Sequence, residues 1–236
     1  MLTAPPTRYS VPYIASFVLS CASSGAWAAA ALDSLTSRDA AGALHAALSQ
    51  GIDTAVAQLG ANNGFLNDPK VTIPLPPALE KANRALRLVG MGGEADKLKA
   101  GMNHAAEAAV AEAKPVFKAA LQRMTVADAK AILTGGDDAG TQYFRRATGA
   151  QLTAKFKPIV TRETGRLQLA SLYDQYAGKA AGLGLITTQD AHLDDYVTAK
   201  ALDGLFGRIA EEEHAIRQDP LGQANSLIKK VFGAVR

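Results

Sequence analysis

Apolar side chains recur every three or four residues through most of this chain, and this spacing constrains the fold more than any other feature. Leu44, Leu48 and Ile52 begin one such series, which Val56 and Leu59 continue. The spacing places the apolar side chains on one face of an α-helix. Convincing alternation of apolar and polar residues over five or more positions, which would indicate a half-buried β-strand, is absent from the sequence. We therefore predict an all-α fold.

Capping residues, glycines and prolines indicate where the helices begin and end. Thr36 with Asp39 and Thr125 with Asp128 have the spacing of capping boxes, which start helices. Pro115 is expected to kink or split the third helix. By residue number, we expect helices at about 36–59, 76–89, 94–124, 125–134, 138–147, 151–160, 167–182, 196–218 and 226–235.

Two segments rich in glycine, proline and small polar residues interrupt the helical pattern. Residues 61–77 (ANNGFLNDPKVTIPLPP) and 183–195 (LGLITTQDAHLDD) are predicted to be loops, the first with a short extended piece at VTIPLP. A bend is also expected at Pro158. Residues 29–236 show no fixed internal period, so we predict one bundle-like domain of several helices rather than a solenoid.

The N-terminal segment, residues 1–28, has the three parts of a secretory signal peptide. Arg8 is its single charged residue, an apolar run follows at about 11–19, and small residues lead to Ala28. The apolar run is well short of the ~20 residues that span a bilayer, so no transmembrane span is expected. We expect cleavage after Ala28 and a periplasmic protein. The alternative is an outer-membrane-associated lipoprotein anchored at Cys21, although the residues before this cysteine fit that signal poorly.

Cleavage after residue 28 would change the composition in ways that exclude several kinds of chemistry. Cys21 is the only cysteine, so the mature protein would have no thiol for a disulfide, a nucleophile or a thiolate metal site. Arg8 is one of 25 basic residues, and its loss leaves 24 against 22 acidic residues, a net charge of +2. This near-neutral balance argues against nucleic-acid binding, and no sequence pattern calls for a cofactor.

The segment LTGGDDAGTQYFRR, Leu133 to Arg146, joins two predicted helices. Its pair of glycines, Gly135 and Gly136, suits the end of a helix, because glycine adopts the left-handed conformation without steric cost. Asp137 or Asp138 is then expected to cap the next helix by accepting orphan backbone N–H groups. This structural role explains most of the segment, which we call the polar corner.

Capping leaves several polar side chains of the polar corner without a role. Asp138, Thr141, Gln142 and Arg145 recur about one turn apart and are expected to share a helix face. Two carboxylates would repel a phosphate, whereas a divalent cation would suit them, so the identity of any bound metal stays open. The candidate ligand-binding residues of the corner are Asp137, Asp138, Thr141, Gln142, Tyr143, Arg145 and Arg146.

Glu211 and His214 form an E-x-x-H pair, the spacing used in di-iron carboxylate bundles. Such sites need a second pair, but none of His45, His104 and His192 follows a glutamate by three positions. We therefore interpret the segment EEEHAIRQDP as a solvated acidic face near a helix end, with Arg208 and Arg217 as intrahelical partners. Glu211 is kept as a candidate ligand-binding residue.

Glu107 lies with Asn103 and Lys114 along one stripe of a helix that otherwise consists of alanine and apolar residues. A buried carboxylate needs a partner, and we expect Arg145 or Arg146 to provide it. A structural ion pair is favoured over a catalytic acid, because the hydrolase patterns G-x-S-x-G and H-E-x-x-H are absent from the sequence. Glu107 is the last candidate ligand-binding residue.

Several blocks of the chain resemble those of one family of exported bacterial proteins. These blocks include GFLNDPKVTIPLP, MTVADAKAILTGGDDAGTQYFRR and ALDGLFGRIAEEEHAIRQDP. The family they resemble is catalogued as domain of unknown function 4197, and the resemblance covers nearly all of residues 29–236. It implies a helical domain behind a signal or lipoprotein leader in Gram-negative bacteria. It implies no activity and no catalytic residue.

The sequence leads us to expect a non-catalytic protein that binds an envelope partner, a small ligand or a metal ion through the polar corner. We expect the bundle to press this corner into one pocket with Glu107 and Glu211. An alternative is an envelope-acting hydrolase, which needs two carboxylates converging on one cleft. A structural or chaperone-like envelope factor is a third hypothesis, and it would expose a large apolar groove.

Overall fold

The computed structural model describes residues 37–88, 90, 92–182 and 193–219. These residues form eight helices and no strand, which confirms the predicted all-α fold. The expected signal peptide, Cys21, the expected last helix and most of the second loop lie outside the described residues. The helices are α2 (Ser37–Leu59), α3 (Pro77–Leu88), α4 (Gly92–Val110), α5 (Lys114–Arg123), α6 (Val126–Leu133), α7 (Ala139–Arg166), α8 (Leu169–Gly182) and α9 (Leu193–Gln218).

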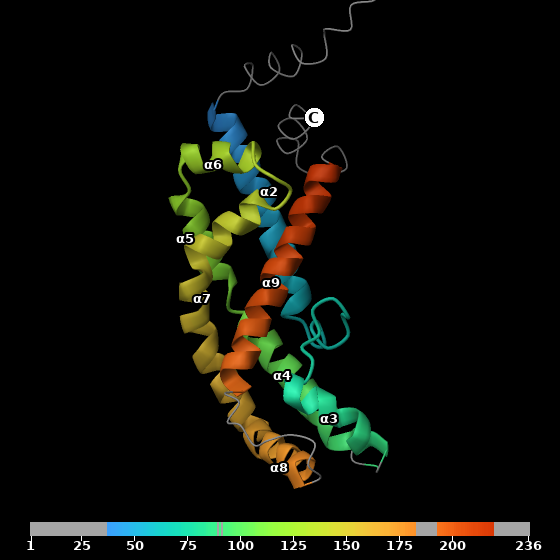
Figure 1. The fold of residues 1–236 in the computed structure, drawn as a ribbon. Coiled ribbons are helices and arrows are strands. Elements are labelled where there is room, and N and C mark those ends of the chain that lie inside the picture. The colour runs from blue at the N-terminus through green and yellow to red at the C-terminus, as the bar shows by residue number, and fades with distance from the viewer. Residues whose placement is uncertain (1–36, 89, 91, 183–192, 220–236) are drawn as a thin grey trace, which may run out of the picture.

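The helices form an elongated bundle in which α7 packs against both α4 and α9 (Figure 1). At one end α2 packs against α9, and α6 crosses over α2 and the start of α7. At the other end lie α3 and α8, both in contact with α4. The described chain begins and ends near α6, so the start of α2 and the end of α9 are at the same end of the bundle.

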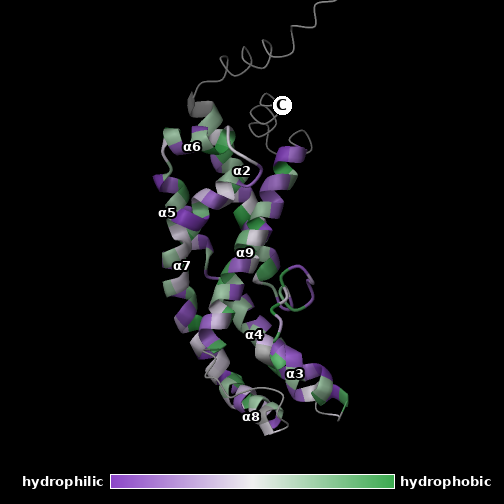
Figure 2. Ribbon diagram, viewed as in Figure 1, coloured by the Kyte–Doolittle hydropathy of each residue, from purple (hydrophilic) through white to green (hydrophobic). Residues whose placement is uncertain are grey.

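An aromatic cluster joins three helices in the core. The Phe117 ring of α5 meets Phe144 of α7 and Phe206 of α9 edge to face, with centroids 5.5 and 6.0 Å apart. All three side chains are buried, and this arrangement is the favourable one for aromatic pairs. Hydrophobic and hydrophilic residues are interleaved along each helix, as expected for helices that bury one face (Figure 2).

Several predicted helix boundaries are confirmed. Helix α3 begins at Pro77, as the sequence predicts, whereas the predicted start of the first helix at Thr36 lies outside the described residues. The capping box of α6 is present, because the Thr125 hydroxyl accepts the Asp128 N–H at 3.1 Å and the Asp128 carboxylate accepts the Thr125 N–H at 3.0 Å. The chain also divides into α4 and α5 just before Pro115.

The predicted break near Ala147 is wrong, because α7 runs without interruption from Ala139 to Arg166. Its buried residues recur at four-residue steps across the expected break, so packing against α4 and α9 keeps the segment helical. Pro158 lies inside the helix on its exposed side, where water can reach the carbonyl group that proline leaves unpaired. The buried residues of α7 that recur at four-residue steps are Phe144, Thr148, Leu152, Phe156, Val160 and Thr164.

Candidate functional site

The polar corner connects the end of α6 to the start of α7. Asp138 occupies the N-cap position of α7, but its side chain makes no capping hydrogen bond. Its carboxylate instead accepts a hydrogen bond from the Gln142 side-chain amide at 2.9 Å. The predicted location of the cap is therefore right, whereas the predicted chemistry, in which an aspartate of the corner accepts the orphan N–H groups, is wrong.

Glu213 of α9 performs the capping instead. One of its carboxylate oxygens accepts the Gly140 N–H at 2.9 Å, and the other accepts the Thr141 N–H and the Thr141 hydroxyl, each at 2.8 Å. A carboxylate at this position satisfies orphan donors and faces the positive end of the helix dipole. The first turn of α7 is therefore fixed by a side chain 72 positions further along the chain.

Arg217 completes a buried network around this carboxylate. Its guanidinium donates to Glu213 at 2.8 and 3.2 Å, and also to the Ile132 carbonyl oxygen of α6 at 2.9 Å. The Glu213 and Arg217 side chains are only 5% and 12% exposed, so removal of either would strand a buried charge. The network links the ends of α6, α7 and α9.

Gly140 allows the Glu213 carboxylate to approach the first turn of α7. A Cβ atom at this position would lie 2.6 Å from the Leu48 Cδ2 atom and 3.0 Å from the Glu213 Oε1 atom. Both distances are too short for an ordinary contact, so any larger side chain would displace the buried Leu48 side chain or the capping carboxylate. The glycine of the sequence DDAGT is thus required by close packing.

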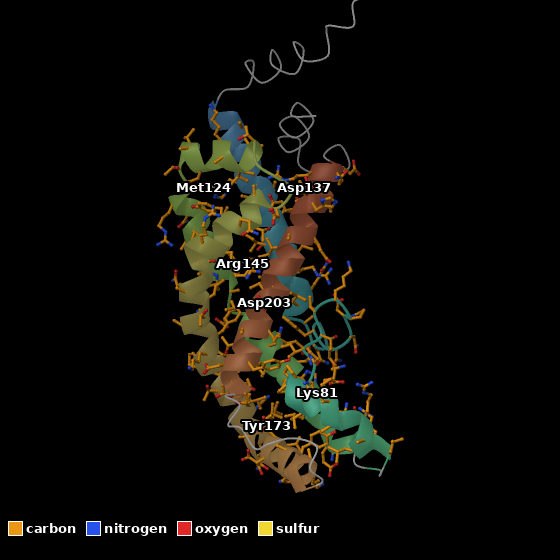
Figure 3. The ribbon with its side chains drawn as sticks, viewed as in Figure 1. Lys81, Met124, Asp137, Arg145, Tyr173 and Asp203 are labelled. Atoms are coloured by element: carbon orange, nitrogen blue, oxygen red, sulfur yellow. The ribbon has the colours of Figure 1, made fainter. Side chains whose placement is uncertain are left out.

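The two aspartates of the corner point outward. The Asp137 carboxylate lies 3.4 Å from the His214 Nδ1 atom, and both side chains are more than half exposed. Figure 3 shows Asp137 beside the upper part of α9, at the end of the bundle that holds α6. Thr141 is buried against Glu213, so the expectation that it shares one outward face with Asp138 and its neighbours is wrong.

The remaining corner residues lie further along α7. The Arg145 guanidinium lies 4.7 Å from the Phe206 ring centroid and 3.4 Å from the Asp203 carboxylate (Figure 3). Arg145 therefore covers the aromatic cluster, while Arg146 is exposed. Tyr143 is partly buried, and burial raises the pKa of its hydroxyl group.

Glu107 has partners other than those predicted. Its carboxylate accepts backbone N–H groups of Asn63, Phe65 and Leu66 at 3.1, 3.1 and 3.4 Å, and it contacts the His104 Nδ1 atom at 2.9 Å. The expected pairing with an arginine of the polar corner is wrong. Because its oxygens already accept these donors, Glu107 serves to fix the loop after α2 to α4.

Glu211 also contacts that loop. Its carboxylate pairs with Lys70 at 2.9 Å and with Arg208 at 2.8 Å, and Arg208 also pairs with Asp68. The Arg208 pairing confirms the predicted intrahelical partner. Glu107 and Glu211 share no contact with Asp138, so the expected common pocket does not form. These two candidate residues hold the 61–76 loop, and the polar corner is a separate surface.

Two features of the described residues bear on the kind of site. No group of three or more His, Cys, Asp and Glu side chains in the described part of the chain is arranged to hold a metal ion. None of the described helices is long and apolar enough to cross a membrane.

Sequence reasoning missed Glu213, although a signal for it is present. Leu205 and Ile209 precede it at four-residue steps on the buried face of α9, and Arg217 follows at the same step. This register predicts a buried carboxylate with an intrahelical cation. The interpretation of the EEE run as a solvated acidic face is wrong for Glu213, because its side chain is buried.

The fold and the corner define an all-α protein in which a buried glutamate–arginine pair joins the ends of three helices. The model of the family described as "Protein of unknown function (DUF4197)" matches residues 34–233. The chain belongs to this family, as its sequence blocks predict. No curated protein and no solved structure matches the chain.

Proposed function

We propose that this chain is an exported, non-catalytic binding protein that contacts a protein partner of the cell envelope through the outward face of the polar corner. The face consists of Asp137, Asp138 and Gln142 from the start of α7, with His214 from α9 beside them. All four side chains are exposed. The partner we expect presents a basic side chain to the two carboxylates.

The observation that carries this proposal is the capping of α7 by Glu213. Because that carboxylate accepts the orphan N–H groups, the Asp137 and Asp138 side chains are not needed to cap α7. Their contacts with His214 and Gln142 are solvent-exposed pairs, which contribute little to stability. A partner can replace these contacts at small cost.

The two other functions considered from the sequence have less support. A hydrolase would use Glu107 or Glu211, but the first is engaged by loop amides and the second by two cations. A chaperone-like factor would expose an apolar groove. The large hydrophobic residues exposed within the described part of the chain are Leu88, Val126 and Leu167, which belong to different segments.

The test is chemical cross-linking in cells that produce the full chain, followed by native mass spectrometry of the purified protein. The probe variant is Asp137→Asn with Asp138→Asn. The control variant is Asp53→Asn with Glu112→Gln, which removes two exposed carboxylates that pair with surface lysines away from the corner. Both variants change the net charge equally.

We expect wild type and the control variant to carry the same covalent adduct, and the probe variant to lose it. An adduct that persists in the probe variant, or that both variants lose equally, would contradict a role for the corner.

We propose export on the basis of the three-part pattern in residues 1–28. The intact mass of the mature protein tests this proposal directly. Cleavage after Ala28 predicts an unmodified chain that begins at Ala29. A chain that begins at an acylated Cys21 would establish the lipoprotein alternative, and a chain that retains residues 1–28 would contradict export.

A further inference from the structure

A cleft of about 710 Å³ lies at the opposite end of the bundle from the polar corner. Its walls come from the end of the 61–76 loop, the first turns of α3 and the start of α9. The volume is in the range that small-molecule sites occupy. The residues that line it are Pro74, Leu75, Pro77, Glu80, Lys81, Arg84, Tyr196 and Lys200.

The charge of this cleft is strongly positive for its size. Lys81, Arg84 and Lys200 supply three cations, and Glu80 is the one carboxylate among the described residues that line the cleft. None of the three cations forms an ion pair with another residue that the structure describes. The described lining residues therefore carry a net charge of +2, which would favour an anionic occupant.

An aromatic ring forms part of the wall. The Tyr196 hydroxyl donates to the Pro74 carbonyl oxygen at 3.2 Å, which fixes the ring against the loop. The Lys200 ammonium lies 6.0 Å from the ring centroid. Burial raises the pKa of the Tyr196 hydroxyl, so the group stays a neutral hydrogen-bond donor. The wall thus offers a flat apolar surface next to cations.

The loop that carries this wall is held rigidly. The Asn103 side chain accepts the Ile73 N–H at 2.8 Å and donates to the Ile73 carbonyl oxygen at 3.0 Å. Pro74 and Pro77 further restrict the backbone on either side of Leu75. A wall ordered in advance lowers the entropic cost of binding.

We propose that this cleft binds an organic phosphate monoester, with the phosphate on the three cations and the organic group against Tyr196. A phosphate monoester carries about −1.5 to −2 charges at neutral pH, which matches the net charge of +2 on the described lining residues. The Arg84 guanidinium can donate two parallel hydrogen bonds to it, while the lysines supply point charges. A phosphate monoester group occurs both in soluble metabolites and in the headgroup of phosphatidic acid.

The experiment titrates the mature protein with phenyl phosphate, followed by ¹H–¹⁵N NMR, and separately measures sedimentation with vesicles containing phosphatidic acid. The probe variant is Lys81→Ala with Lys200→Ala. The control variant is Lys118→Ala with Lys130→Ala, which removes two exposed lysines outside the cleft. Folding of each variant is checked by its thermal unfolding.

We expect wild type and the control variant to bind at least one of the two probes, with a Kd of about 1 mM or lower. If phenyl phosphate binds, the backbone amide resonances of Tyr196 and Lys200 should change their chemical shifts. Binding should weaken about tenfold or more in the probe variant, while the control stays within about twofold. Binding of phenyl phosphate would indicate a soluble ligand, and binding of vesicles alone a lipid headgroup. Binding of neither probe, or equal loss in both variants, would overturn the proposal.

Discussion

The Glu213 carboxylate of α9 accepts the Thr141 N–H of α7 at 2.8 Å. This contact closes the first turn of α7 from another helix, and the aspartates of the GGDD sequence take no part in it. The carboxylate is held in turn by Arg217, so the pair positions the polar corner without using its outward side chains.

Replacement of Gly140 by alanine should destabilise the protein. The new Cβ atom would lie 2.6 Å from Leu48 Cδ2 and 3.0 Å from Glu213 Oε1, and we expect a loss of about 1–3 kcal/mol in the free energy of unfolding. The matched control is Gly149→Ala in the same helix, where nothing lies within 4 Å of the added atom. That change should stabilise the protein by about 0.5–1 kcal/mol. Urea unfolding measures both, and equal effects would refute the close-packing argument.

The Glu107→Gln variant should loosen the 61–76 loop. The amide group that replaces one carboxylate oxygen would face backbone N–H donors, so we expect a loss of roughly 3 kcal/mol in unfolding free energy. Hydrogen exchange should quicken most at Asn63, Phe65 and Leu66, the residues whose N–H groups Glu107 accepts. The exposed Glu112→Gln variant should change stability by less than about 0.5 kcal/mol. Unchanged exchange at the three loop amides would contradict the assignment.

The capping box of α6 should make stability depend on pH. Hydrogen bonds from Thr125 lower the pKa of the Asp128 carboxyl group below its ordinary value of 3.8. Since the folded pKa is depressed, the contribution is complete above that ordinary value and is lost as the pH falls through the folded pKa. The Tm of wild type should exceed that of Asp128→Asn at pH 7, and the difference should vanish in strong acid. A difference that grows on acidification would have the wrong sign.

The sequence predicted those parts of the fold that depend on local chemistry. Capping boxes and prolines start helices through contacts between residues at most four positions apart. The capping box at Thr125 and the helix start at Pro77 are both confirmed. Contacts between distant segments were harder to predict. The four-residue spacing of Phe144, Leu152 and Phe156 indicates that the helix continues past Ala147, but the packing of this face against α4 and α9 is visible only in the structure.

In the candidate site, too, features set by the local sequence were predictable and contacts between distant segments were not. The outward position of Asp137 is compatible with the local sequence, whereas the true cap comes from Glu213, 72 positions away from Thr141. The partners of Glu107 are backbone groups of a loop, which the side-chain pattern of a sequence does not reveal. The cleft beside Tyr196 likewise joins residues from segments more than a hundred positions apart.

The most direct test of this account is amide hydrogen exchange at Gly140 and Thr141 in the Glu213→Gln and Asp138→Asn variants. If Glu213 caps α7, the first variant should expose both amides to exchange far more than Leu152 within the same helix. It should also lose about 3 kcal/mol of stability, because the buried Arg217 guanidinium loses its carboxylate counter-charge. The second variant should match wild type at both amides. Fast exchange in Asp138→Asn, with both amides still protected in Glu213→Gln, would contradict the account.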